Sequence, residues 1–271
     1  MSLLLDECRL PVMLGDVAES RITAALAPLH THRQCAHLRF ATLNEPGLAH
    51  PLTHIIFNGP PGGGDPVRIG FFAGIHGDET AGVHSLIRFV SGLVNTPSRA
   101  RGYQLHVYPV CNPSGFEDAT RHSRNGKDLN REFWIGSQEP EVQVLEREIL
   151  SHRFHGLVSL HADDTSEGVY GFVRGAVLSQ ALLEPALRAA SAILPRNRNS
   201  IIDGFPARDG IISECYDGIL TSPRDLDPTP FELILETPQS APDARQEEAL
   251  LLALHSILAE YQNFLSYAAD L

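Results

Sequence analysis

The sequence has only four cysteines, Cys8, Cys35, Cys111 and Cys215, and no two of them form a CxxC pair. Their wide spacing argues against a zinc ribbon or a small disulfide scaffold, so we interpret them as free thiols in a reducing compartment. No apolar stretch approaches the roughly 20 residues that a membrane span requires. The first residues, MSLLLDECRLPVM, contain only a three-leucine run and lack the pattern of a signal peptide. We therefore expect a cytoplasmic protein.

Positive charge is also scarce, because 33 acidic residues outnumber 21 Lys and Arg and give a net charge of −12. Non-specific nucleic-acid binding depends on neutralising phosphates, so this charge argues against it. The apolar fraction of 43% and the charged fraction of 20% are those of an ordinary globular protein. We expect one large domain with no nucleic-acid or membrane partner, and the composition leaves an oligomer open.

Strand-like apolar runs alternate with helical patterns beyond residue 50. We expect strands at 52–59, 67–73, 103–110, 156–160 and 231–238, and helices at 81–94, 139–151, 178–194 (interrupted by Pro185) and 243–265. This alternation predicts an α/β fold with a mostly parallel mixed central sheet and helices on both faces. Residues 1–50 carry a helical pattern at 17–29 and a strand pattern at 37–43. We expect them to be an N-terminal extension packed on the main domain, which spans 51–271.

The segments richest in reactive side chains each follow a predicted strand. They are GIHGDE (74–79), CNPSG with DLNR (111–115 and 128–131), LHADD (160–164) and LETP (235–238). In open α/β sheets, ligands sit beyond the carboxyl ends of the strands. We therefore expect these strand ends to meet at one crevice.

The turn after residue 73 predicts half of a metal site. His76 and Glu79 are separated by two residues, and Gly77 between them lets the backbone curl without obstruction. Catalytic zinc takes three nitrogen or oxygen ligands and keeps one position open for water. His161 is the best third ligand, because it follows another buried strand and has Asp163 and Asp164 behind it as partners.

These residues also have a simpler interpretation. An HxxE pair is frequent by chance, and His161 alone is typical of an ordinary histidine at a strand end. Asp78 would in that case stabilise the N-terminus of the following helix by its charge.

The segment NPSGFEDATRHSRNGKDLNREFW (112–134) is the most specific text in the chain. Together with AGIHGDE and the later His and Glu, it resembles the zinc carboxypeptidase superfamily, which includes aspartoacylase and succinylglutamate desuccinylase. The family order is HxxE, an N-P turn, an Arg, N-R, a His after a strand and a Glu in a late strand, and all six occur here in that order. The resemblance implies that residues 51–271 form the catalytic domain.

The resemblance also implies residue roles. One Zn²⁺ ion would be bound by His76, Glu79 and His161. Arg131 would hold a substrate carboxylate with Asn130 beside it, since a guanidinium offers a carboxylate two parallel hydrogen bonds.

The remaining catalytic roles leave alternatives open. Arg121 would stabilise the oxyanion, with Arg124 as its rival. Glu236 would be the general base. Glu232 lies on the same face of that strand, four residues earlier, but Glu236 is closer to the strand's C-terminal end.

Two further assignments are less distinct. Tyr216 would close over the substrate, and Tyr170 is the other candidate for this role. Arg224 would favour acidic substrate side chains if it lined the pocket; otherwise it is a surface arginine beside Asp225.

The function that the resemblance implies is zinc-dependent hydrolysis of an amide next to a free carboxylate. A metallocarboxypeptidase that removes the C-terminal residue of a small peptide is the first hypothesis. An N-acyl amino acid deacylase is the second, and an inactive zinc-binding member of the family is the third.

Overall fold

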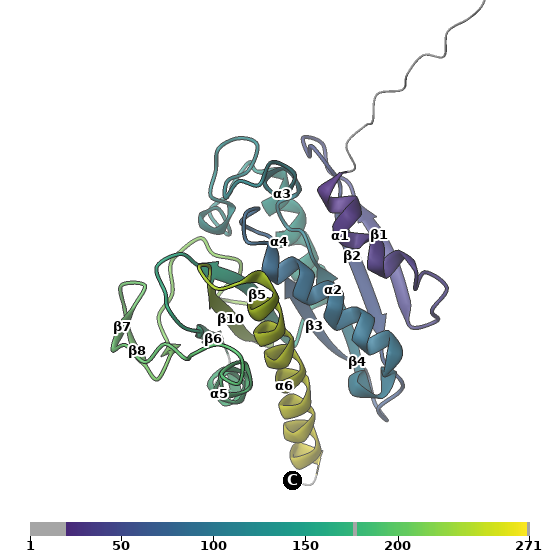
Figure 1. The fold of residues 1–271 in the computed structure, drawn as a ribbon. Helices are drawn as coiled ribbons and strands as arrows, with labels where there is room; N and C mark the ends of the chain where they lie inside the picture. Colours follow the sequence, from purple (N-terminus) through teal and green to yellow (C-terminus); the bar gives the residue numbers. More distant parts are fainter. Residues whose placement is uncertain (1–19, 176–177, 270–271) are drawn as a thin grey trace, which may run out of the picture.

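The computed structural model describes residues 20–175 and 178–269. Within these residues the chain folds around one large mixed sheet with helices on both faces (Figure 1). The strand order is β1-β2-β4-β3-β5-β10-β6-β9-β8-β7. The strands are β1 (Leu38–Leu43), β2 (Leu52–Asn58), β3 (Val67–Phe72), β4 (Tyr103–Tyr108), β5 (Gly156–Asp163), β6 (Tyr170–Gly175), β7 (Ile201–Ile202), β8 (Phe205–Arg208), β9 (Ile211–Ile212) and β10 (Phe231–Pro238).

The centre of the sheet is parallel and its flanks are largely antiparallel. Strands β4, β3, β5 and β10 run in the same direction. Strand β2 pairs antiparallel with β4, β6 pairs antiparallel with β10, and β1 pairs antiparallel with β2. Central strands are covered on both faces, which is why β3 and β5 read as near-continuous apolar runs. The expected α/β class is confirmed, and the parallel part provides the strand ends on which a site can be built.

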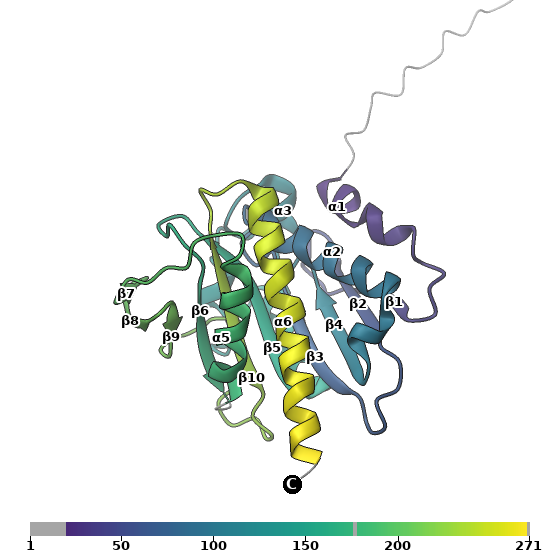
Figure 2. The same ribbon diagram turned by 60° about the horizontal axis from the view of Figure 1, so that its bottom comes forward.

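Helices cover the two faces of the sheet unequally. Helices α2, α5 and α6 lie side by side over one face, with α1 beside α2 (Figure 2). Helix α4 packs on the opposite face. The helices are α1 (Arg21–His30), α2 (Thr80–Asn95), α3 (Pro113–Asp118), α4 (Pro140–His152), α5 (Leu178–Ala190) and α6 (Asp243–Ala269), with short 3-10 turns at Pro97–Ala100 and Leu129–Arg131.

Two main apolar cores follow from the alternation of side chains along the strands. Val158 and Leu160 of β5 belong to the core beneath α2 and α6, whereas Leu157 belongs to the core beneath α4. His161 has the same parity as Leu157. It is therefore directed to the α4 face of the sheet, away from the larger core.

Most expected elements agree with the structure to within a few residues. Helix α5 differs, because it continues through Pro185 without interruption. The short strands β7 and β9, of two residues each, and the neighbouring β6 and β8 were not predicted.

The described part of the N-terminal segment is joined closely to the rest of the chain. Strand β1 pairs with β2 along its whole length, and the backbone N–H of Arg21 donates to Glu117 Oε2 at 2.9 Å. Cys35, Cys111 and Cys215 are free thiols, as expected, and Cys8 lies outside the described residues. Across 20–175 and 178–269, no helix has the length and apolar character to cross a bilayer.

Two glycines lead to opposite predictions for stability. Gly92 lies inside α2 with open space where a Cβ would be, so Gly92→Ala should raise the free energy of unfolding by about 0.5–1 kcal/mol. A Cβ on Gly77 would lie 1.9 Å from the carbonyl carbon of Gly115, so Gly77→Ala should lower the free energy of unfolding. Urea unfolding followed by Trp134 fluorescence measures this free energy for both variants. Equal effects of the two substitutions would contradict this packing.

A candidate metal centre and active-site cavity

The candidate metal ligands lie where β3 and β5 end. His76 is in the turn between β3 and α2, Glu79 is the residue immediately before α2, and His161 is near the end of β5. The backbone of Gly77 packs directly against that of Gly115, so the HGDE turn can approach the NPSG turn only because residue 77 is glycine. The first two motifs of the resemblance are thus in direct contact.

Glu79 lies between the two imidazoles. His76 Nδ1 is 2.5 Å from Glu79 Oε1, and His161 Nδ1 is 3.1 Å from Glu79 Oε2. One ligand atom from each of the three residues lies within 4.8 Å of the other two, and all three side chains are buried. Two imidazole nitrogens and one carboxylate are a known donor set of catalytic zinc, so the residues fit this ion.

The other nitrogen of each imidazole is also engaged. His76 Nε2 contacts Asp128 Oδ1 at 3.1 Å, and His161 Nε2 contacts Ser159 Oγ at 2.9 Å. Such outer partners fix the orientation of ligating histidines and the nitrogen that is left for the metal. Here both partners direct Nδ1 toward Glu79.

The charges of this cluster depend on one another. Burial opposes ionisation of Glu79, but the two histidines outweigh it and hold the pKa of its carboxyl well below the usual range. Burial also opposes ionisation of Asp128, but His76 and Arg121 lower the pKa of that carboxyl. Both carboxylates are therefore anionic at neutral pH, and Glu79 is ready to bind a cation.

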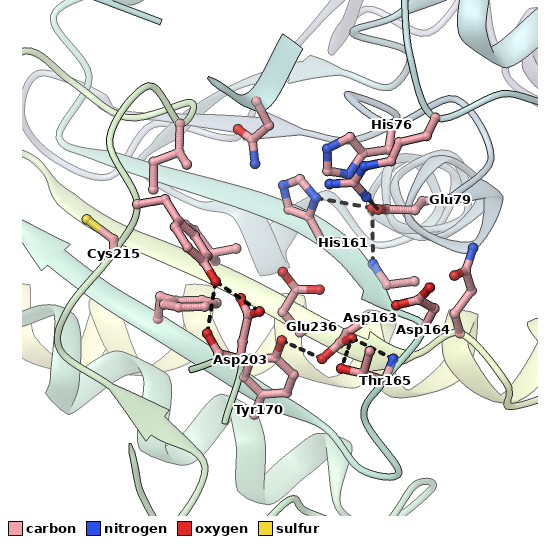
Figure 3. Close-up of a pocket in the computed structure, with 18 of the residues that line it drawn as sticks. His76, Glu79, His161, Asp163, Asp164, Thr165, Tyr170, Asp203, Cys215 and Glu236 are labelled. Carbon is pink, nitrogen blue, oxygen red and sulfur yellow. Dashed lines mark hydrogen bonds and ion pairs between the residues drawn. The ribbon is translucent and has the colours of Figure 1, made fainter. Parts of the chain in front are cut away.

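A cavity of about 380 Å³ opens beside these residues, a size that suits a small ligand. Figure 3 shows its wall, with the histidines and Glu79 on one side, Glu236 near the middle and Asp203 on the other side. The lining residues include all three candidate ligands, both cavity arginines, several carboxylates and a small apolar wall: His76, Glu79, His161, Arg121, Arg131, Asn130, Asp78, Asp163, Asp164, Asp203, Glu236, Thr165, Tyr170, Tyr216, Gln239, Cys215, Ala162, Phe172, Ile219 and Ile234.

Glu236 is the register partner of His161 in the parallel pair β5–β10. Neighbours in register point to the same face, so its carboxyl is directed into the cavity beside the metal ligands. Burial, together with the nearby charges of Glu79 and Asp163, raises the pKa of Glu236 well above its ordinary value. Its rival Glu232 lies outside this cavity, where its Oε1 accepts a hydrogen bond from the Ser222 backbone N–H at 2.6 Å.

The two candidate oxyanion arginines are separated by the structure. Arg121 lines the cavity and donates to Asp128 Oδ2 at 3.0 Å and to Glu79 Oε1 at 3.4 Å. Arg124 is exposed, and its side chain is not among those that line the cavity. Position alone favours Arg121.

Asn130 and Arg131 line the cavity together with Tyr216. The Asn130 side chain is held by the Leu220 backbone N–H, which donates to Oδ1 at 2.9 Å. The Arg131 guanidinium carbon lies 4.3 Å from the centre of the Tyr216 ring, a cation–π contact that holds the guanidinium in place. The Tyr216 hydroxyl donates to the Asp203 carbonyl at 2.9 Å.

Tyr170, the other tyrosine candidate, also lines the cavity but is fully buried. Its hydroxyl donates to Asp163 Oδ2 at 2.8 Å. Asp163 therefore pairs with Tyr170 and Thr165 rather than with His161, the partner expected from its place in the sequence.

Sequence comparison identifies a family. The Succinylglutamate desuccinylase/Aspartoacylase catalytic domain family matches residues 67–198. No curated protein matches the chain at a significant level.

Three solved structures illustrate the similarity of fold. A proposed metallopeptidase from Shewanella amazonensis is 23% identical, with a TM-score of 0.74, over 88% of this chain and 92% of its own. A metallo-carboxypeptidase from Burkholderia cenocepacia is 17% identical, with a TM-score of 0.67, over 88% of this chain and 68% of its own. A metallo-carboxypeptidase from Pseudomonas aeruginosa is 14% identical, with a TM-score of 0.61, over 87% and 68%.

The family match covers just under half of the chain and the solved structures share its fold, so the chain is similar to the zinc carboxypeptidase-like superfamily.

Some parts of this zinc carboxypeptidase-like cavity were not expected from the sequence. Asp128 could have been identified from the sequence, because it is the first residue of the DLNR segment that was already singled out. Asp203 is in the turn between β7 and β8, with a φ of 50°, and no periodic pattern pointed to it. Arg224 lies outside the cavity with its side chain 85% exposed, so the structure gives it no part in reading a substrate side chain.

The contact between Asp128 and His76 predicts a role in metal binding. Asp128→Asn should weaken zinc affinity about 10- to 100-fold, because the partner that orients a ligating histidine would lose its charge. Zinc affinity is measured by competition with a chelator of known affinity. Arg124→Ala, a change in the same loop but outside the cavity, should leave the affinity unchanged. If both variants bound zinc like the parent chain, the proposed orienting role would be wrong.

Proposed function

We propose that this chain is a zinc-dependent hydrolase that cleaves an amide bond next to a free carboxylate. The observation that carries the proposal is the composition of one cavity. It combines a three-residue zinc donor set with a carboxyl of raised pKa, Glu236, and with two guanidinium groups, those of Arg121 and Arg131. Each of these groups has a separate use in amide hydrolysis.

His76, Glu79 and His161 would hold the zinc ion. Bound there, zinc would supply Lewis-acid chemistry to the scissile carbonyl and its attacking water. Arg121 lines the cavity and contacts the proposed ligand Glu79 and the neighbouring Asp128. Its guanidinium would therefore lie near the metal, where it would stabilise negative charge as it develops on the carbonyl oxygen.

Glu236 would act as the general base and then as the general acid. It would take one proton from the attacking water and return it to the nitrogen of the departing amine. A carboxyl whose pKa is raised by burial is a stronger proton acceptor than an ordinary carboxylate, which suits it to this exchange.

Asn130 and Arg131 would anchor the substrate carboxylate. Their side chains line the same cavity as the metal ligands, and both are held in place, Asn130 by Leu220 and Arg131 by the ring of Tyr216. Fixing the carboxylate at this point would position the scissile bond next to the catalytic groups.

Two substrate classes fit these features. Removal of the C-terminal residue of a peptide is supported by the metallo-carboxypeptidases of the same fold. The Pseudomonas aeruginosa enzyme is in complex with (2-guanidinoethylmercapto)succinic acid, a ligand that carries carboxylates and a guanidine. Deacylation of an N-acyl amino acid is the second candidate, and the desuccinylase/aspartoacylase family match supports it.

A substrate panel separates these two classes. The zinc-loaded chain would be assayed on hippuryl amino acids and on N-acetyl and N-succinyl amino acids, with release of the amine as the readout. Turnover of the hippuryl series supports the peptidase, and turnover of the N-acyl series alone supports the deacylase. Zinc binding without turnover of any substrate would identify an inactive zinc-binding member and overturn the proposal.

We also propose that the protein works in the cytoplasm. The free thiols of Cys35, Cys111 and Cys215 support a reducing compartment.

Substitution of Glu236 tests its catalytic role. Glu236→Gln should lower kcat by about 10²- to 10⁴-fold, because the proton shuttle is lost, and zinc content should not change. Glu232→Gln is the matched control, since it makes the same change on the same strand outside the cavity. Similar losses of kcat in both variants would show that the substitutions disturb strand β10 rather than proton transfer.

Excess acidic groups in the cavity predict a preference for cationic substrates. Asp163, Asp164 and Asp203 line it in addition to Glu236, and only two arginines oppose them. We expect substrates with a Lys or Arg side chain to be cleaved faster than their Glu counterparts. Because Asp203 is exposed, Asp203→Asn should reduce that preference by no more than about fivefold. The ratio of kcat/KM for paired Lys and Glu substrates measures it, and an unchanged ratio would exclude Asp203 from substrate selection.

A further inference from the structure

Three histidines form a second cluster, on the part of the sheet that contains β2 and β4. His54 of β2, His106 of β4 and His152, the last residue of α4, lie between the sheet and α4. One ring nitrogen from each lies within 4.8 Å of those of the other two. His54 and His106 are 3% and 2% exposed, and His152 is more open, with its side chain 27% exposed.

Glu148 contacts two of these imidazoles. It lies one turn before His152 on α4, and its Oε2 is 3.2 Å from His54 Nδ1 and 3.2 Å from His152 Nε2. The Tyr108 hydroxyl donates to the same oxygen at 2.8 Å. An ionised carboxylate only accepts hydrogen bonds, so His152 carries its hydrogen on Nε2 and its lone pair is on Nδ1.

Gln104 fixes the hydrogen of the third imidazole. Its Nε2 donates to Asn58 Oδ1 at 2.9 Å, which directs its Oε1 to His106 Nε2 at 3.2 Å. A carbonyl oxygen accepts, so His106 carries its hydrogen on Nε2 and its lone pair is on Nδ1.

Two of the ring nitrogens face each other across a short distance. His54 Nε2 and His106 Nδ1 are 3.0 Å apart. With a hydrogen on His54 Nε2 the two rings share one hydrogen bond, and with that hydrogen on Nδ1 both nitrogens offer a lone pair to one cation. Two nitrogens bound to one tetrahedral zinc ion are roughly 3.3 Å apart, which is close to the observed spacing.

We propose that His54, His106 and His152 bind a second divalent transition-metal ion, with Glu148 orienting two of the three imidazoles. Three imidazoles are a zinc donor set, and a carboxylate on the outer nitrogen of ligating histidines is the usual arrangement. The ion would join the C-terminal turn of α4 to β2 and β4. Its ligands on β2 and β4 lie three and two strands away from β5 in the sheet, which is roughly 10–15 Å at about 4.8 Å per strand.

This site makes a structural contribution rather than a catalytic one. Its ligands come from three elements that are far apart in the sequence, so a bound ion would stabilise the folded chain relative to the unfolded chain. The proposal does not depend on the proposed hydrolase activity.

Counting zinc in matched variants of the full chain tests it. After dialysis against buffered free zinc, elemental analysis should give two ions per parent chain. His76→Ala and His152→Gln should each retain one, and the double variant should retain none. His84→Ala is the control, because His84 is a half-exposed histidine of α2 outside both clusters, and it should retain two ions.

A thermal measurement guards against effects of misfolding. Zinc at about 100 times its dissociation constant should raise the Tm of the His76→Ala variant by about 5 °C, and it should not raise that of the double variant. One ion per parent chain, lost entirely in His76→Ala, would overturn the second site and leave the first intact. One ion per parent chain that is retained by His76→Ala and lost in His152→Gln would instead mean that the catalytic site had failed and this one had not.

Discussion

The site depends on the placement of one buried carboxylate. Glu79 lies in a nearly dry environment, where an ionised carboxyl is costly unless it is paired. His76 and His161 contact its two oxygens, and the backbone N–H of Ala162 donates to Oε2 at 3.1 Å. Since Glu79 immediately precedes α2 and Ala162 lies in β5, this carboxylate joins the start of α2 to the strand that carries His161.

The charges around this carboxylate divide the cavity into two parts. On one side, Arg121 donates to both Glu79 and Asp128 and completes a compact network around the histidines. On the other side, Asp163 and Asp203 are bound by tyrosine hydroxyls instead of by cations. The first part is suited to holding a metal and an oxyanion. The second part keeps its negative charge, with which a substrate can interact.

Much of the central fold was predictable because its signals are local. Apolar runs of five to eight residues followed by glycine-rich turns indicate buried strands, and Phe231–Pro238 agrees with the predicted strand at both ends. Strands β7 to β9 are too short to show any period, and Asp203 lies in the turn between two of them, so it could not be found in this way. Pro185 would end an isolated helix, but packing of α5 against α6 outweighs the local preference.

The candidate site was predictable to the extent that its residues follow strands. His76, Glu79, His161 and Glu236 each come at a strand end, and their convergence follows from the parallel direction of the central strands. Glu236 was preferred to Glu232 because it is closer to the strand end, whereas the contact of Glu232 with Ser222 is one that no local pattern reveals. The histidine cluster on β2, β4 and α4 could not be identified from the sequence, because only the folded chain brings its members together. The catalytic roles themselves stay predictions.

Register between β5 and β10 has a further consequence. Side chains alternate between the two faces of a sheet, so a shift of β10 by one residue would turn Glu236 toward α6 and bring Leu235 to face the metal ligands. Such a shift would bury the Glu236 carboxyl among apolar core side chains, and it would turn Leu233 and Leu235 out of that core. The apolar pattern of β10 thus favours the register that places Glu236 beside the candidate metal ligands.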